Sequence, residues 1–128
     1  MTRILVIEDE AAFRGVVAVA LRTNGYEVLE ASDGRVALAL LKEHSVDVIL
    51  TDVHMPDVDG VEVIMTLRKM KSGVPIIAMT GHPVLTEVYL RVTKALGAER
   101  VLEKPFTMDV LLAAVRDVVR ATGSQPST

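Results

Sequence analysis

The stretch VDVILTDVHMPDVDG, from Val46 to Gly60, decides the fold of this chain. Four of the five residues before Thr51 are apolar and most of these are β-branched, which predicts a strand buried on both faces of a parallel sheet. The run Met55-Pro56-Asp57 then ends the regular structure. Reacting groups in open α/β sheets collect just beyond the carboxyl ends of the strands. Asp52 stands at such an end and is therefore a candidate nucleophile or metal ligand.

The composition limits the organisation of the chain and its classes of function. At 128 residues it fits one domain, which we expect over residues 1–121, with a disordered polar tail over 122–128. The absence of cysteine excludes disulfides, cysteine-bound zinc and thiol catalysis. A net charge of −3 without a Lys/Arg cluster predicts no direct nucleic-acid binding. Apolar runs of strand length predict no membrane association, and a start without room for a signal peptide favours a cytoplasmic protein.

Further apolar runs alternate with amphipathic segments along the chain. Besides the run ending at Asp52, we predict strands at 4–7, 27–31, 74–79 and 101–102. A helical pattern follows each strand, and in the first helix one face is formed by Phe13, Val17, Ala20 and Leu21. Five strands alternating with five helices through short loops predict an α/β fold, with a parallel sheet covered by helices on both faces.

Each predicted strand leads into its helix at the same edge of the sheet. The polar residues expected at that edge are Glu8, Asp9, Asp52, Thr80 and Lys104. Three carboxylates in one cleft repel unless a cation neutralises them, and a set of oxygen ligands favours Mg²⁺. A carboxylate such as Asp52 can also attack phosphorus, provided that the ion, the Lys104 ammonium and the Thr80 hydroxyl neutralise the phosphoryl oxygens. These parts suit phosphoryl transfer to Asp52.

Together these motifs resemble the response-regulator receiver domains of two-component signalling, of the stand-alone type, over about Arg3 to Ala121. The matching motifs are Glu8-Asp9, VILTDVHMPDVDG, Met79-Thr80-Gly81, the LGA of 96–98 and Lys104-Pro105-Phe106. The resemblance implies a doubly wound (βα)5 fold, whose five-stranded parallel sheet has the flavodoxin-like order 2-1-3-4-5. It also implies a phosphorylation-controlled switch and not a turnover enzyme. The phosphoryl donor would be a phosphohistidine on a sensor histidine kinase or phosphotransfer protein, or a small acyl phosphate.

The resemblance implies a role for each residue of the phosphoryl site. Asp52 would be the phosphoacceptor, and Thr80 the switch residue that moves toward the phosphoryl group. Lys104 would bridge Asp52 and the phosphate, with a cis bond to Pro105 aiming its ammonium inward. Gly81, which has no side chain, leaves space for the incoming phosphoryl group.

The resemblance also implies a Mg²⁺ site. Asp9 and Asp52 would be direct ligands, Glu8 would bind through a water molecule, and the backbone carbonyl of His54 would complete the protein ligands. His54, two residues after Asp52, and His82, at the matching position of the next loop, would lie where water approaches the acyl phosphate. We hypothesise that both histidines tune the phosphoryl lifetime between about pH 6 and 7. Solvated loop histidines without effect are the alternative.

One departure from the family concerns output. The family commonly carries an aromatic residue three positions before the lysine, where this chain has Val101. Switching would then travel through Thr80, the loop 81–83 and the fourth helix, although Val101 as a locally packed strand residue is the alternative. The face formed by the fourth helix, the fifth strand and the last helix carries surplus apolar residues and is a candidate surface for a downstream protein target or a homodimer. A large aliphatic core would also explain them.

Several of these residues also have simpler interpretations. Glu8-Asp9 alone could cap the first helix, and Ser32 or Asp33 can cap the second. Asp57 and Asp59 are better explained as turn residues than as ligands. The joint placement at one edge is what favours a functional site.

Two other functions compete with the phosphoacceptor switch. A degenerate receiver would bind partners without phosphorylation, but the set at the predicted edge is intact. An aspartyl-phosphate phosphohydrolase would carry a second aspartate two residues after the nucleophile, where this chain has His54. The sequence shows no output domain after Ala121, so the chain acts alone or belongs to a longer regulator.

Overall fold

The computed structural model describes residues 1–53, 65–66, 68–69, 73–81 and 97–121. The predicted fourth helix, the tail and most of the predicted third helix lie outside these residues. The elements of the described part are β1 (Arg3–Ile7), α1 (Ala11–Thr23), β2 (Glu27–Ala31), α2 (Gly34–Glu43), β3 (Val48–Asp52), β4 (Ile76–Thr80), β5 (Arg100–Glu103) and α5 (Met108–Ala121).

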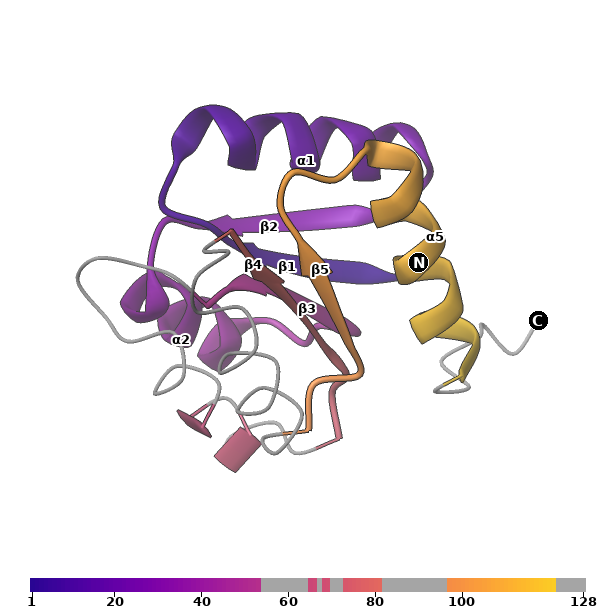
Figure 1. Cartoon of the computed structure of the whole chain (residues 1–128). Helices are drawn as coiled ribbons and strands as arrows, with labels where there is room; N and C mark the ends of the chain where they lie inside the picture. The colour runs from indigo at the N-terminus through magenta and orange to yellow at the C-terminus, as the bar shows by residue number, and fades with distance from the viewer. Residues whose placement is uncertain (54–64, 67, 70–72, 82–96, 122–128) are drawn as a thin grey trace.

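The described strands form one parallel sheet in the order β2-β1-β3-β4-β5, as predicted (Figure 1). In its register Ile7 pairs with Thr51, and Asp52 pairs with Met79. Thr80 in turn pairs with Glu103. The strands therefore end together, and the residues that follow them meet at one edge of the sheet.

Helices cover both faces of the sheet, which confirms the doubly wound arrangement. Figure 1 shows α1 and α5 together on one face, whereas α2 lies on the other. Alternate strand residues point to opposite faces, so each strand contributes to two cores. The first core joins strand residues such as Val6 and Leu50 to α1 and α5, and the second joins residues such as Leu5 and Ile49 to α2.

The local signals at the ends of the elements act much as predicted. Gly25 follows α1 with a φ of 91°, a left-handed conformation that favours glycine. Of the two candidate caps for α2, Asp33 is the one that the structure selects, because its Oδ1 accepts a hydrogen bond of 2.9 Å from the Val36 amide. The fourth strand begins at Ile76, so Val74 and Pro75 precede it.

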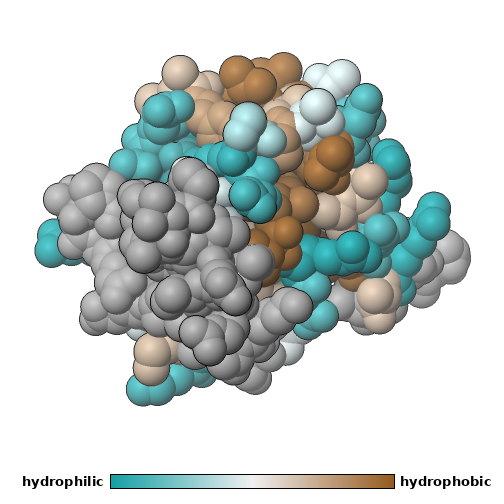
Figure 2. Space-filling model, viewed as in Figure 1, coloured by the Kyte–Doolittle hydropathy of each residue, from teal (hydrophilic) through white to brown (hydrophobic). Residues whose placement is uncertain are grey.

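The surface of α1 carries apolar side chains. Figure 2 shows hydrophobic residues at the surface in the region of this helix, and Val16 and Val19 are 55% and 63% exposed. On α5, Leu112 and Val119 pack partly buried against the first core, whereas Val110 is exposed. Within the described part of the chain, no helix has both the length and the apolar character required to span a bilayer.

Candidate functional site

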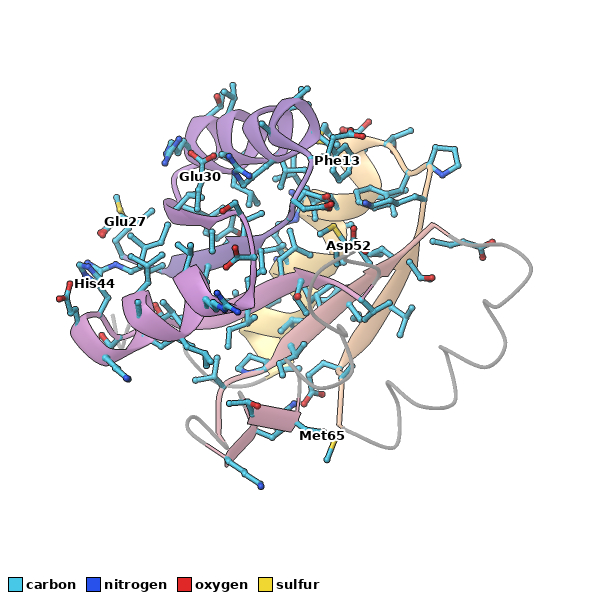
Figure 3. The ribbon with its side chains drawn as sticks, turned by 90° about the vertical axis from the view of Figure 1, so that its left-hand side faces the viewer. Phe13, Glu27, Glu30, His44, Asp52 and Met65 are labelled. Carbon is cyan, nitrogen blue, oxygen red and sulfur yellow. The ribbon has the colours of Figure 1, made fainter. Side chains whose placement is uncertain are left out.

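Three carboxylates meet at the carboxyl edge of the sheet, as the sequence predicts. Glu8 and Asp9 follow β1, and Asp52 ends β3; Figure 3 shows Asp52 in this position. One oxygen from each carboxylate lies within 4.8 Å of one from each of the others. Glu8 and Asp52 are buried, whereas Asp9 is exposed. Such a group of hard oxygen ligands, open to solvent on one side, fits a hydrated divalent cation such as Mg²⁺.

Glu8 is held by two hydrogen bonds despite its burial. Its Oε1 accepts a bond of 2.8 Å from Lys104 Nζ, and its Oε2 accepts one of 3.0 Å from the Glu10 amide. Burial raises the pKa of the Glu8 carboxyl, the charge of Asp52 adds to this, and the two hydrogen bonds oppose it. The buried anion is therefore only partly compensated by the groups around it.

Lys104 joins the acidic cluster from the far end of the chain. Its Nζ lies 2.8 Å from Glu8 and 3.1 Å from Asp52 Oδ2. Burial alone would lower the pKa of Lys104, but the hydrogen bond to Glu8 and the charge of Asp52 outweigh it, so that the pKa is raised. The ammonium is thus a stable positive charge directly beside the Asp52 carboxylate. The peptide bond between Lys104 and Pro105 is cis, as the resemblance implied.

Thr80 and Gly81 lie at the end of β4, the strand that pairs with the Asp52 strand. Thr80 is fully buried, and its Oγ1 finds no hydrogen-bond partner in the described part of the molecule. A Cβ added to Gly81 would lie 3.3 Å from Lys104 Cδ. The main chain at Gly81 therefore packs directly against the aliphatic part of the lysine side chain.

Other residues singled out in the sequence lie elsewhere. His54 and His82 fall outside the described residues, as do Asp57 and Asp59, so the predictions for them stay predictions. Val101 is partly buried and packs against the second core.

Neither Glu8 nor Asp9 takes the N-cap position of α1, which the helix-cap interpretation of the acid pair would require. The N-cap of α1 is Glu10, whose side chain makes no capping hydrogen bond. The Glu8 carboxylate instead accepts one hydrogen bond from Lys104 Nζ and another from the Glu10 amide. Its polar contacts therefore serve the site and the start of α1 together.

Phe13 also belongs to this site, although the sequence pattern predicts only that it lies on the buried face of the first helix. Its ring lies beneath the Lys104 ammonium, with Nζ 4.6 Å from the ring centroid. Helical periodicity predicts which face of α1 is buried. It carries no signal for the contact with Lys104, which follows β5.

Comparison with known proteins agrees with this geometry. The family model of the response regulator receiver domain matches residues 4–116. A probable transcriptional regulator, ycf27 of Porphyridium aerugineum, is 40% identical over 92% of this chain and 48% of its own length. The crystal structure of a CheY-like receiver domain protein from Methanospirillum hungatei JF-1 has a TM-score of 0.89 and 25% identity, covering 98% of this chain and 99% of the other.

A further solved structure bears on the metal. The response regulator TrrA from Thermotoga maritima, in complex with Mg(2+)-BeF, has a TM-score of 0.79 and 29% identity, with coverage of 92% of this chain and 99% of the other. Magnesium thus occurs in a protein of the same fold as this chain.

The fold, the carboxylate cluster with its lysine and the family match lead to one identification. The chain belongs to the response regulator receiver domain family, and it is therefore the receiver domain of a two-component response regulator. It spans about half the length of the curated relatives that it matches, 48% and 51% for two of them.

Proposed function

We propose that this domain is a phosphoacceptor switch, in which Asp52 receives a phosphoryl group in a Mg²⁺-dependent reaction. The observation that carries the proposal is the position of Lys104 Nζ, 3.1 Å from Asp52 Oδ2, beside the three-carboxylate cluster. An oxygen of Asp52 bonds to phosphorus, the bond from phosphorus to the leaving oxygen breaks, and the electron pair departs on the donor. Lys104 stays protonated and balances the negative charge of the phosphoryl oxygens.

The acidic cluster supplies the proposed metal site. Asp9 and Asp52 would bind Mg²⁺ directly, and Glu8 would act through a water molecule, because its two oxygens are already engaged by Lys104 and the Glu10 amide. The His54 carbonyl is a further proposed ligand. When bound, the ion would neutralise the cluster and orient the phosphoryl group.

We propose that Thr80 is the switch residue. Its buried hydroxyl lies at the end of the strand that neighbours Asp52, and it lacks a hydrogen-bond partner among the described residues. A phosphoryl oxygen on Asp52 would supply the missing acceptor. This gives a physical reason for Thr80 to move when Asp52 is modified.

The experiment that tests the function measures the intact mass of the protein after incubation with acetyl phosphate. The expected result is one phosphoryl adduct that requires Mg²⁺ and disappears in Asp52→Asn. The matched control is Asp47→Asn, because Asp47 lies just before the same strand but uses its carboxylate to bind the Arg3 amide at 2.8 Å. This variant should still form the adduct. An adduct that persists in Asp52→Asn would place the reaction elsewhere.

The same assay separates the competing functions. A degenerate receiver would form no adduct with acetyl phosphate or with a phosphorylated histidine kinase. A phosphohydrolase would instead release inorganic phosphate over many turnovers. A single adduct with slow loss, at a rate that changes with pH only while His54 and His82 are present, would support the switch and the proposed role of the histidines.

The partners follow from this proposal. A phosphohistidine on a sensor kinase or a phosphotransfer protein would be the donor. A downstream protein or a second copy of the chain would bind the face formed by the fourth helix, β5 and α5, and a cytoplasmic location would serve both. The probable transcriptional regulators among the relatives are about twice as long as this chain, so a longer regulator that carries this domain is an equally testable context.

A further inference from the structure

Both phenylalanines of this chain gather at the candidate site, although aromatic residues are rare in it. The whole sequence contains two phenylalanines, two tyrosines and no tryptophan. The ring of Phe13 lies beneath the Lys104 ammonium. Phe106 packs against Phe13 edge to face, with 5.8 Å between the ring centroids and 73° between the ring planes. In a chain with four aromatic residues, the placement of both phenylalanines beside Lys104 calls for a reason.

The contact between Phe13 and Lys104 has the geometry of a cation–π interaction. The Nζ atom lies 4.6 Å from the ring centroid, within the limit of about 6 Å for such contacts. The same ammonium donates hydrogen bonds to Glu8 and Asp52. The negative face of the ring therefore adds a third attraction from another direction.

A lysine needs such support in order to act as a fixed charge. Its ammonium sits on a flexible stem of four carbons, and the side chain of Lys104 is still 25% exposed. The main chain at Gly81 restricts the movement of the aliphatic part of the Lys104 side chain on one side. Phe13 limits the positions open to the ammonium. The ring of Phe13 is itself packed against Phe106 and the first core.

We propose that Phe13 is a positioning residue for phosphoryl transfer, whose ring face holds the Lys104 ammonium beside Asp52. The inference rests on the proposed function and deepens it. Phe13 takes part in no bond making or breaking: the Asp52 oxygen bonds to phosphorus, acetate leaves with the electron pair of the broken bond, and Lys104 keeps its proton. The Phe13 ring affects only the position of the Lys104 ammonium.

The decisive test changes the electrons of the ring and not its size. Phenylalanines with increasing ring fluorination, incorporated at position 13 alone, keep nearly the same volume but weaken the negative ring face. We expect the second-order rate constant for phosphorylation of Asp52 by acetyl phosphate, measured in a single turnover, to fall step by step, by roughly three- to tenfold over the series. The fall should lie in the maximal rate constant of phosphoryl transfer and not in the affinity for acetyl phosphate, because the ammonium matters most when charge develops on the phosphoryl oxygens.

Ordinary substitutions give a second, independent reading. Phe13→Leu should lose as much activity as the most fluorinated variant, whereas Phe13→Tyr and Phe13→Trp should keep the rate within about twofold, because their ring faces also bind cations. The matched control is Tyr26→Leu. Tyr26 packs against the same core as Phe13 but precedes β2, at the opposite edge of the parallel sheet from Lys104, which follows β5. This variant should therefore phosphorylate at the normal rate.

A Lys104→Met background separates positioning from packing. If Phe13 acts through the ammonium, the fluorinated variants should all react at one rate in this background. A series that is flat in the wild-type background, or that falls equally in the Lys104→Met background, would overturn the inference.

The failure of this inference can be told from the failure of the proposed function. The NMR signals of the Lys104 Hε protons should lie upfield through the ring current of Phe13 and return in Phe13→Leu, whether or not the protein accepts phosphate. Unshifted signals would overturn the inference even if Asp52 is phosphorylated. Shifted signals in a protein that accepts no phosphoryl group from any donor would refute the proposed function and, with it, a role for this contact in catalysis.

Discussion

At the scale of single residues, the most informative group is the Thr80 hydroxyl. It is buried at 0% exposure, and the described residues offer it no hydrogen-bond partner. A buried hydroxyl without a partner costs free energy of folding. The resting protein therefore carries a local instability at the position where the proposed phosphoryl group would bring an acceptor.

The substitution Thr80→Val tests this interpretation, because valine replaces the hydroxyl with a methyl group at nearly the same volume. We expect the free energy of unfolding of the unphosphorylated protein to rise by about 1 kcal/mol. The measurement is urea denaturation, with Thr80→Ser as the control that keeps the hydroxyl. A loss of stability in Thr80→Val would show that the hydroxyl has a good partner in solution.

The same residue shows where prediction from the sequence ends. Parallel strands and their order place Glu8, Asp52, Thr80 and Lys104 at one edge, so the members of the site could be predicted. The orphaned hydroxyl of Thr80 and the ring of Phe13 under Lys104 could not. Both depend on side-chain packing between strands and a helix that lie far apart in the sequence, and no local pattern carries that information.

At the scale of elements, the helices are attached to the sheet by polar contacts as well as by the cores. On α1, Arg14 donates a hydrogen bond of 2.8 Å to the Glu8 carbonyl, and its side chain also pairs with Glu30 on β2. Arg22, two turns later, pairs with the same Glu30. Since these ion pairs are partly exposed, we expect each to contribute little stability by itself.

The start of α2 allows a sharper prediction at this scale. Asp33→Ala removes the carboxylate that accepts from the Val36 amide, and we expect a loss of about 1 kcal/mol in the free energy of unfolding. Ser32→Ala is the matched control, since the sequence left both residues as candidates and the structure selects Asp33. Chemical denaturation of the two variants should separate them. Equal losses would mean that both side chains share the cap.

The sequence predicted the elements better than their ends. The second strand, 27–31, has the predicted bounds, because Gly25 ends the preceding helix and Asp33 begins the next one. The fourth strand starts two residues later than predicted, since an apolar Val74 continues the hydrophobic pattern without joining the ladder. Apolar patterns report burial, whereas the bounds of a strand depend on its hydrogen-bonded neighbours.

At the scale of the whole molecule, the acidic cluster couples metal binding to stability. Glu8, Asp9 and Asp52 bring three negative charges within 4.8 Å of one another, and Lys104 compensates them only in part. An ion that binds the folded chain stabilises it, by about 2.7 kcal/mol at a concentration one hundred times its dissociation constant.

We therefore expect Mg²⁺ to raise the denaturation midpoint of the wild-type protein, and chelation to reverse the change. Asp9→Asn should lose most of this response, because it removes a proposed direct ligand, while in the absence of Mg²⁺ it should be at least as stable as the wild type. A sodium salt of equal ionic strength is the control for screening. An equal response of both proteins to Mg²⁺ would argue against Asp9 as a ligand.

The late position of Lys104 in the chain has a consequence during synthesis of the protein on the ribosome. Its ammonium reaches back 52 residues to Asp52 and 96 residues to Glu8. At a synthesis rate of about 5 to 20 residues per second, roughly 3 to 10 seconds pass between the addition of the aspartate and that of the lysine. During that interval the nascent chain carries the carboxylates without the cation that pairs with them. If Asp52 is the phosphoacceptor that we propose, readiness to receive a phosphoryl group would come only once synthesis has passed β5, and the unfinished chain would not respond to the donor.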